Sequence, residues 1–247
     1  MRTSKVIGIA GGMGPKSGLL LFDYILKHTT ASCDQEHLSV ILMSFPKQIQ
    51  DRTAFLEGEI EQNPAYEIGK LINKLAAAEA EVIGIPCNTS HTEKILKVVH
   101  EKCLPPNFKA KVLHMPFEVI KYLENDYQQY RRIGVLSTNG TYRSEIYKTY
   151  LENAGFIPVI PDADFQYNIV HKLIYDPHFG LKANTDKITD VAQQYIEKII
   201  TYFQEENAEL IIFGCTELSM LNNFNMTIPF VDSTEVLAKA LIREAIS

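Results

Sequence analysis

The chain has 247 residues, of which 46% are hydrophobic and 22% are charged, and its formal net charge is −6. This length and composition predict a folded protein of one large or two ordinary α/β domains and exclude a disordered chain. No block of Lys and Arg favours nucleic acid, and no apolar run is long enough to cross a membrane. Without a signal peptide the sequence predicts a cytoplasmic protein, whose four cysteines are free thiols rather than disulfides.

The first third of the chain predicts two strands, each followed by a polar turn. Residues 5–10 form a buried strand that ends in Gly11-Gly12-Met13-Gly14-Pro15, and a helix follows. This turn could present backbone N–H groups to an anion, or be a tight turn without a ligand. Residues 37–44 form the second strand, and an irregular stretch up to about Pro64 comes next. Its Asp51-Arg52-Thr53 could grip a carboxylate with two hydrogen bonds, or remain a solvated charge pair.

A thiol follows the third strand. Helical spacing over residues 65–80 leads to an apolar strand over 81–85, which ends in Pro86-Cys87-Asn88-Thr89. Open α/β sheets bind their ligands at the carboxyl ends of parallel strands, and the thiol falls at such an end. After another helix a strand begins at Lys111, and Pro116 then opens a helix, as proline favours. We place a domain boundary there.

The second half of the chain repeats the first. Gly8 aligns with Gly134 at an offset of 126, and Cys87 aligns with Cys215 at an offset of 128. Two motifs that recur in order at nearly one spacing suggest duplicated halves. The other elements expected here are helices over 142–154, 165–174, 188–203 and 236–245 and strands over 132–137, 156–160, 209–213 and 228–231.

Strands that alternate with helices predict a parallel sheet in each half. We therefore expect an α/β protein of two similar domains, 1–115 plus 226–247 and 116–225. If the halves faced each other, a cleft between them would be lined by the turns after the strands, with one thiol from each side.

The four cysteines divide into two kinds. Cys33 and Cys103 are predicted to be small buried hydrophobes, which is the usual role of a free cysteine. Cys87 and Cys215 instead lie among Asn, Thr, Ser and Glu. A helix N-terminus can lower a thiol pKa from about 8.5 toward neutrality, where the group can exchange protons. A single thiol of this kind suggests a nucleophile, but one on each side of a cleft suggests racemisation or epimerisation.

Four motifs, taken in order, resemble those of the cofactor-independent aspartate/glutamate racemase family, and especially its aspartate racemase branch. They are the opening GGMGP, Asp51-Arg52-Thr53, Pro86-Cys87-Asn88-Thr89 and Gly214-Cys215-Thr216-Glu217. The resemblance implies two α/β domains related by a pseudo-twofold axis, with the active site between them and the last strand and helix packed on the first domain. It also implies a homodimer, a catalytic pair of Cys87 and Cys215, and Arg52 and Lys182 as carboxylate-binding residues.

The neighbours of the thiols complete the predicted site. His91 and Glu217 could tune the thiols, although Glu217 could equally cap a helix. No metal is expected because the Cys and His spacing is not that of a ligand set. No pyridoxal phosphate is expected either, because neither a Schiff-base lysine nor a phosphate cradle is evident. The groups expected to hold the substrate's α-carboxylate and ammonium are Asn88, Thr89, Ser137, Thr138, Thr216 and backbone N–H groups around Met13 and Gly14.

We expect the substrate to be aspartate, because Arg52 and Lys182 could supply one cation for each carboxylate. Glutamate differs by one methylene, which separates substrates only weakly. Glutamate racemisation, broad amino-acid specificity, and a related hydantoin racemase or isomerase activity are the alternatives from the same superfamily. A non-enzymatic amino-acid-binding protein is the alternative from another class.

Overall fold

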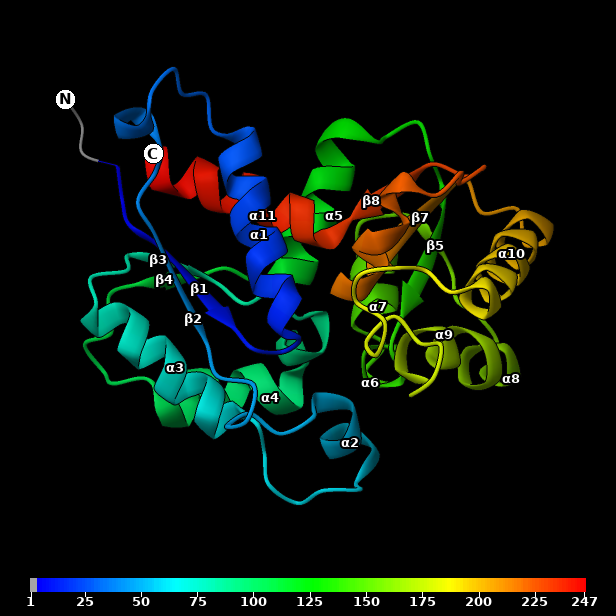
Figure 1. The fold of residues 1–247 in the computed structure, drawn as a ribbon, viewed down its shortest axis with the longest axis horizontal. Helices are drawn as coiled ribbons and strands as arrows, with labels where there is room; N and C mark the ends of the chain where they lie inside the picture. The colour runs from blue at the N-terminus through cyan, green and yellow to red at the C-terminus, as the bar shows by residue number, and fades with distance from the viewer. Residues whose placement is uncertain (1–3) are drawn as a thin grey trace. The chain divides into compact units, whose positions relative to one another are not determined.

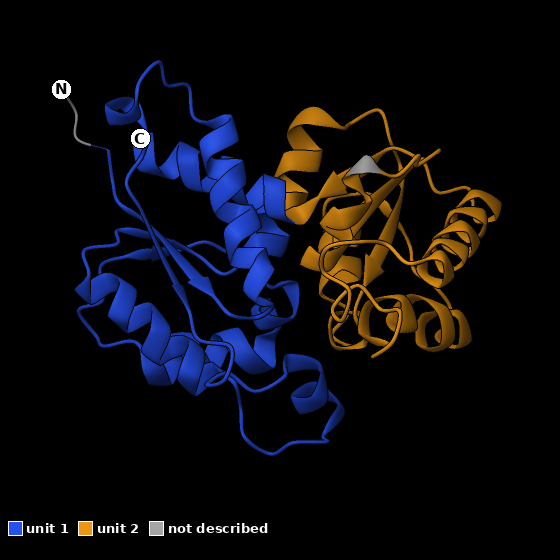
Figure 2. Cartoon of the chain, in the orientation of Figure 1, with its two compact units in different colours: residues 1–118, 234–247 blue, residues 119–233 orange. Residues whose placement is uncertain are grey.

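The computed structural model describes residues 4–247, apart from the side chain at position 223, and divides into two compact units. One consists of Met1–Glu118 and Thr234–Ser247, and the other of Val119–Ser233 (Figure 2). Each unit contains one four-stranded sheet whose strands are all parallel. The predicted fold class of two similar α/β halves is confirmed.

The sheet of the first unit has the strand order β2-β1-β3-β4 (Figure 1). Its strands are β1 (Ile7–Gly11), β2 (Val40–Ser44), β3 (Val82–Gly84) and β4 (Lys111–Val112). The two central strands are buried throughout, as expected for a parallel sheet covered on both faces.

Helices cover both faces of this sheet. Helices α1 (Pro15–His28) and α11 (Ser233–Ile246) pack on one face, where their apolar residues form a cluster with β1. Helices α3 (Ala65–Ala77) and α4 (Glu93–Val98) pack on the other. A Cβ atom at Gly84 would lie 2.7 Å from Cδ1 of Leu241, so glycine lets α11 approach β3 closely without displacing that side chain.

The stretch predicted to be irregular contains a short helix, α2 (Arg52–Glu57). The Asp51 side chain caps its N-terminus by accepting a hydrogen bond from the backbone N–H of Ala54 at 2.9 Å. Gly58, with a φ of 80°, ends the helix in the left-handed conformation that glycine favours. The sequence signal for this helix was Asp51, a favoured N-cap residue, followed by residues that include neither proline nor glycine up to Gly58.

The structure separates the two cysteines that were predicted to be buried hydrophobes. Cys103 is partly buried, and a Cβ atom at Gly69 of α3 would lie only 2.3 Å from its Cβ. Burial raises the pKa of the Cys103 thiol, as is typical of a packing residue. Cys33 is exposed, so the prediction for that residue was wrong. It lies beside a one-turn helix, η1 (Asp34–Glu36), which has no buried residue to pack on.

The sheet of the second unit repeats the order of the first, as β6-β5-β7-β8. Its strands are β5 (Arg132–Ser137), β6 (Ile157–Val159), β7 (Leu210–Gly214) and β8 (Phe230–Asp232). Strand β8 pairs with β7 in this sheet, although the resemblance assigned the last strand to the first domain. The chain returns to the first unit only with α11, at Thr234 rather than at residue 226.

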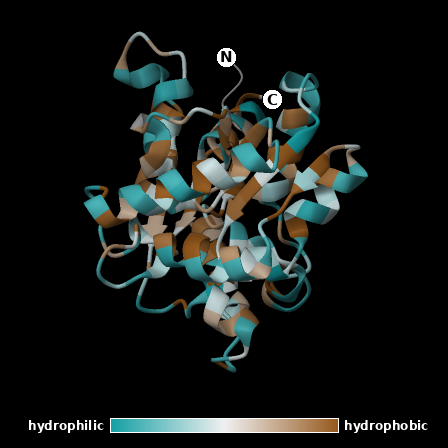
Figure 3. Cartoon of the chain, turned by 90° about the vertical axis from the view of Figure 1, so that its right-hand side faces the viewer, coloured by the Kyte–Doolittle hydropathy of each residue, from teal (hydrophilic) through white to brown (hydrophobic). Residues whose placement is uncertain are grey.

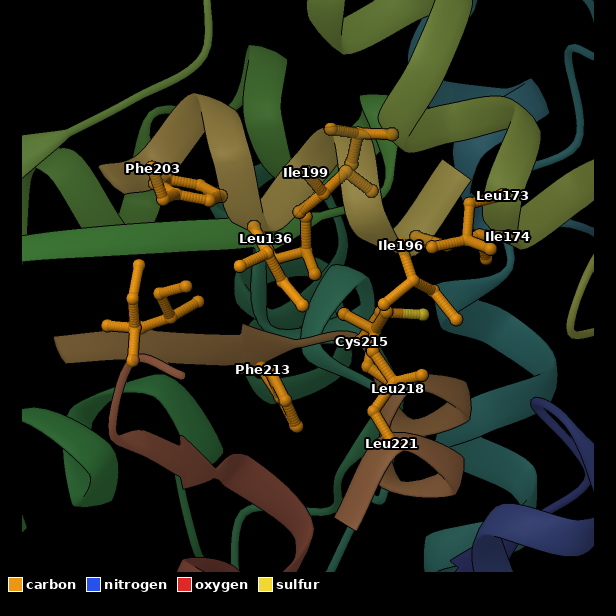
Figure 4. Close-up of a cluster of buried hydrophobic side chains, with 14 of the residues drawn as sticks. Leu136, Leu173, Ile174, Ile196, Ile199, Phe203, Phe213, Cys215, Leu218 and Leu221 are labelled. Atoms are coloured by element: carbon orange, nitrogen blue, oxygen red, sulfur yellow. The ribbon is translucent and has the colours of Figure 1, made fainter. Parts of the chain in front are cut away.

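Long helices and a row of short ones surround the second sheet. Helix α10 (Asp190–Glu205) begins at Thr189, whose hydroxyl accepts from the backbone N–H of Ala192 at 3.2 Å. Buried residues of α9 and α10 belong to one core cluster with Leu136, Phe213 and Cys215 (Figure 4). Helix α5 (Met115–Asp126) begins in the first unit and continues into the second. The other helices of the second unit are α6 (Asn139–Arg143), α7 (Ile146–Asn153), α8 (Ala163–Phe165), the π-helical turn η4 (Gln166–Val170) and α9 (His171–Tyr175).

The helices carry hydrophobic and hydrophilic residues together, whereas the central strands are mainly hydrophobic (Figure 3). This is the pattern of amphipathic helices that cover buried sheets. Across residues 4–247, none of the helices combines the length and the apolar character that crossing a bilayer demands. The remaining short turns are η2 (Asn88–His91), the π-helical η3 (Val99–Cys103) and η5 (Thr216–Asn223).

Candidate active site

Cys87 follows the end of β3 after Ile85 and Pro86, and it is 7% exposed. Its backbone N–H donates to the carbonyl of Ile85 at 2.8 Å, and its own carbonyl accepts from the N–H of Ser90 at 3.1 Å. Pro86 cannot donate to a neighbouring strand, so the sheet pairing stops there and the chain turns at once into η2. The thiol is thus placed at the carboxyl end of a central strand.

The glycine-rich turn after β1 lies beside the turn that carries Cys87. The hydroxyl of Ser90 donates to the sulfur of Met13 at 3.2 Å. Gly12 adopts a φ of 99°, and a Cβ atom there would lie 2.8 Å from the backbone nitrogen of Phe45, so the turn requires glycine. The structure therefore places the predicted residue Met13 beside the turn η2, in which the buried residues Asn88 and Thr89 directly precede Ser90.

His91 is buried and neutral. Its Nε2 donates to the carbonyl of Ile85 at 3.0 Å, which fixes the end of β3. Burial, followed by the repulsion of His114, lowers the His91 pKa to about 3. The two imidazole rings are 5.0 Å apart between centroids. A histidine that stays neutral at physiological pH supplies no positive charge to a thiol. The hydrogen bond to Ile85 and the lowered pKa together favour a positioning role for His91 over the predicted tuning role.

Arg52 is the first residue of α2 and is only 7% exposed. One guanidinium nitrogen, Nη1, donates to the carbonyl of Gln50 at 3.1 Å. Helix α2 contacts η2, so the element that carries Arg52 packs against the turn that follows Cys87. The guanidinium of Arg52 and the thiol of Cys87 are thus presented by adjacent elements of one unit.

Cys215 occupies the matching place in the second unit, directly after β7, and is 5% exposed. Ser137 at the end of β5 is aligned with Gly214 at the end of β7. The carboxyl ends of these two central strands therefore bring Ser137, Thr138 and Cys215 to one edge of the sheet. All three are buried.

Glu217 connects Cys215 with Lys182. The Cys215 thiol donates to Oε2 of Glu217 at 3.0 Å, and the Lys182 ammonium donates to Oε1 of the same carboxylate at 2.7 Å. The hydroxyl of Thr216 also donates to Oε2, at 3.3 Å. The Lys182 nitrogen lies 5.1 Å from the ring centroid of Tyr175, where a cation is attracted to the aromatic face. The predicted residues Lys182, Cys215, Thr216 and Glu217 are thus brought together.

These contacts keep the Cys215 thiol protonated. Burial, with the adjacent Glu217 carboxylate, raises the Cys215 pKa well above its ordinary value, and Lys182 opposes this only in part. The expectation that a helix N-terminus would lower this pKa is wrong, because desolvation and a neighbouring anion outweigh it. Burial also disfavours the ions of Glu217 and Lys182, but their mutual attraction prevails: the Glu217 pKa is lowered and that of Lys182 is raised.

A second set of polar contacts was not predicted from the sequence. The Gln166 amide donates to the carbonyl of Ser137 at 3.0 Å and to Oδ1 of Asn139 at 3.1 Å. The backbone N–H of Asn139 donates to Nδ1 of His171 at 3.4 Å, and the His171 ring stacks on Tyr175 at 4.5 Å. Asn139 could have been found, since it follows Thr138 directly. Gln166 and His171 lie on helices outside any motif, so no sequence signal marked them.

Among the described residues, no three His, Cys, Asp or Glu side chains form a group that could hold a metal ion. Each unit instead offers a buried thiol near the end of a central strand, with hydroxyl or amide groups and one cation, Arg52 in the first unit and Lys182 in the second.

A model of the Asp/Glu/hydantoin racemase family matches residues 10–241, and the chain belongs to this family. It is an isomerase of the racemase class. The resemblance noted from the four motifs is thereby confirmed.

Individual relatives agree with this assignment. The chain is 27% identical to the broad specificity amino-acid racemase RacX of Bacillus subtilis (strain 168), over 96% of each chain. Among solved structures it is similar to Picrophilus torridus aspartate racemase, with 29% identity, coverage of 98% of this chain and 94% of that chain, and a TM-score of 0.78. A Yersinia pestis structure described as a putative Asp/Glu racemase gives 25% identity, coverage of 98% and 100%, and a TM-score of 0.75.

Proposed function

We propose that this protein racemises aspartate without a cofactor, and that Cys87 and Cys215 are its two proton-transfer groups. The observation that carries the proposal is the buried thiol of Cys215 at the end of β7, which donates to Glu217 at 3.0 Å. The repeat supports the same role for Cys87, because this thiol also follows a central strand and is buried.

In the proposed reaction, the Cys87 thiolate removes the α-proton from one face of the substrate, and the Cys215 thiol gives its proton to the opposite face. One C–H bond breaks and another forms, so the configuration inverts and the enzyme is left with the two thiol states exchanged. The reverse direction uses the groups in the opposite order. Lys182 then stabilises the Cys215 thiolate that its neighbour Glu217 disfavours.

An α-proton of an amino acid is weakly acidic, so negative charge that develops on the carboxylate needs preorganised donors. We assign this role to side chains near the thiols and to the backbone around Met13 and Gly14. In each unit these groups come from the turns that follow central strands. The side chains are Asn88, Thr89, Ser137, Thr138 and Thr216.

Aspartate is the proposed substrate because Arg52 and Lys182 are cations on the elements that carry the site. Arg52 would bind one carboxylate with two hydrogen bonds, and Lys182 would provide a point charge for the other. Broad amino-acid specificity is the second candidate. The contact between Lys182 and Glu217 favours it, since that ammonium already has a carboxylate partner. The name of the Bacillus relative agrees with it.

The test is to incubate reduced protein in D2O with L-Asp, L-Glu, L-Asn or L-Ala. Deuterium at the α-carbon is followed by NMR and loss of optical rotation by polarimetry. Wild-type protein should racemise Asp in the presence of a chelator and without pyridoxal absorbance. Size-exclusion chromatography with light scattering on the same sample tests our proposal of a homodimer.

Cys87→Ala and Cys215→Ala should each abolish racemisation, whereas Cys33→Ala, which changes an exposed thiol, should not. If each thiol serves one face, each of the two inactive variants retains α-exchange with at most one enantiomer, and the enantiomer differs between them. Full racemisation by either variant would rule out the two-thiol scheme. A crystal structure with bound substrate should place both sulfurs beside Cα, about 6–9 Å apart, from a reach of about 3 Å on each side.

A further inference from the structure

The ion pair between Lys182 and Glu217 bears on which side chains the site accepts. Building on the proposed function, we propose that Glu217 is a specificity-determining residue. Its carboxylate shares the Lys182 ammonium with the side-chain carboxylate of a dicarboxylic substrate, and it therefore offsets the attraction of Lys182 for such a substrate. The racemase therefore turns over amino acids with uncharged side chains at rates comparable with aspartate.

The pair is preformed within one unit. Lys182 belongs to a loop that is tied to α9 by backbone hydrogen bonds, from Leu181 to Leu173 at 2.8 Å and from Lys182 to Ile174 at 3.0 Å. The ammonium reaches Oε1 of Glu217 at 2.7 Å, and its side chain is 22% exposed. Glu217 is also fixed, because Oε2 accepts from the thiol of Cys215 while Oε1 accepts from Lys182.

An unpaired ammonium at this place would enforce selection for dicarboxylates. A substrate with a neutral side chain would exclude water from the cation and leave it without a partner. The free-energy cost of that unpaired charge discriminates between substrates more strongly than a small difference in side-chain size. Glu217 removes this cost, because Lys182 is paired whether or not the substrate carries a second carboxylate. The side-chain carboxylate of a dicarboxylic substrate is attracted by Lys182 and repelled by Glu217. The binding free energy of this substrate is therefore only slightly more favourable than that of a neutral analogue.

Glu217 also contacts Cys215, and the two roles can be separated. A change in the Cys215 thiol alters proton transfer to every substrate in common, and this effect cancels in a ratio of two kcat/KM values. A change in the charge beside Lys182 alters that ratio, because it acts on the carboxylate of Asp and not on the amide of Asn. Aspartate and asparagine have nearly the same size, so the ratio of their kcat/KM values reports charge.

The experiment compares kcat/KM for L-Asp and L-Asn in wild-type protein, Glu217→Gln, Lys182→Gln and the double variant. Wild-type protein should turn over Asn within about tenfold of Asp, and Glu217→Gln should raise the Asp/Asn ratio by about 10- to 100-fold. Lys182→Gln should remove this gain, so the double variant has the ratio of Lys182→Gln alone. Glu145→Gln is the matched control, since it removes one negative charge from an exposed ion pair of the same unit and should leave the ratio unchanged.

A wild-type preference for Asp over Asn of more than about 100-fold would overturn the inference, and this arm requires no variant to fold. An unchanged ratio in Glu217→Gln with native circular dichroism would overturn it as well. Both outcomes leave the racemase intact. Absence of turnover with every amino acid tested would instead remove the proposed function, and this inference with it.

Discussion

Replacing Lys182 by methionine should destabilise the protein in a pH-dependent way. At their separation of 2.7 Å, and with an effective dielectric constant of about 20, the charges of Lys182 and Glu217 attract by about 6 kcal/mol. Desolvation of both groups offsets much of this attraction, but Glu217 would remain as an uncompensated charge. The side chains are 22% and 10% exposed, so we expect a loss of about 3 kcal/mol in the free energy of unfolding, the low end for a buried pair.

The pH dependence follows from the two pKa shifts. The Glu217 pKa is lowered from 4.5, so its contribution to stability is complete above about pH 4.5 and is lost as the pH falls through the folded value. The Lys182 pKa is raised from 10.5, so its contribution is complete below that pH and is lost only above it. Without Lys182, burial raises the pKa of Glu217, and the carboxylate takes up a proton in the folded protein. The difference between wild type and Lys182→Met should therefore shrink as the pH falls from 7 toward 4.5.

Urea-induced unfolding followed by circular dichroism at pH 7 and pH 5 provides the measurement. Lys148→Met is the matched control, because it breaks an exposed ion pair with Glu145 at 2.9 Å and should cost less than about 1 kcal/mol at either pH. Equal stability of the two variants at pH 7 would refute the energetic coupling of Lys182 and Glu217. So would a loss in Lys182→Met that does not change with pH.

Three further predictions concern single sites. His91 binds no proton in the folded protein until about pH 3, whereas in the unfolded chain it binds one below about pH 6.5. The free energy of unfolding of wild type should therefore fall below pH 6.5, by up to about 1.4 kcal/mol per pH unit. His91→Gln should flatten this pH dependence in urea titrations. Gly69→Ala should cost about 1–3 kcal/mol in the same assay, because its Cβ would meet the Cβ of Cys103 at 2.3 Å. Iodoacetamide should label Cys215 faster in Glu217→Gln than in wild type, because removal of the carboxylate lowers the thiol pKa. Peptide mass spectrometry between pH 7 and 9 measures the labelling rate, and slower labelling in the variant would contradict this cause.

Much of the fold was predictable because its signals are local. Apolar runs that end in turn residues marked the central strands, and the offset between the two cysteines marked the repeat that the two sheets share. The sequence does not show which strand a given strand pairs with. Residues 228–231 predicted a strand correctly, but only the hydrogen bonds of β8 with β7 show which sheet contains it.

The positions of the two thiols in the candidate site were predictable from the sequence, but the pKa of Cys215 was not. Cys215 follows β7 directly and Cys87 follows β3 after two residues, so the place of each thiol at the sheet edge was predictable from the sequence. The pKa of Cys215 depends instead on Glu217 and on Lys182, which is 35 residues from Glu217 along the chain. A helix N-terminus alone suggested the opposite direction for this pKa, because sequence periodicity contains no information on side-chain burial depth or on which carboxylate reaches which ammonium.

The two units differ in how they are threaded along the chain. The second is one continuous segment, whereas the first is completed by α11, whose residues follow the whole second unit. During synthesis the second unit can therefore fold as soon as it leaves the ribosome. The face of the first sheet that α11 covers stays open to water, or to a chaperone, until residues 234–247 emerge. Completion of the half that carries Cys87 thus has to wait for the half that carries Cys215.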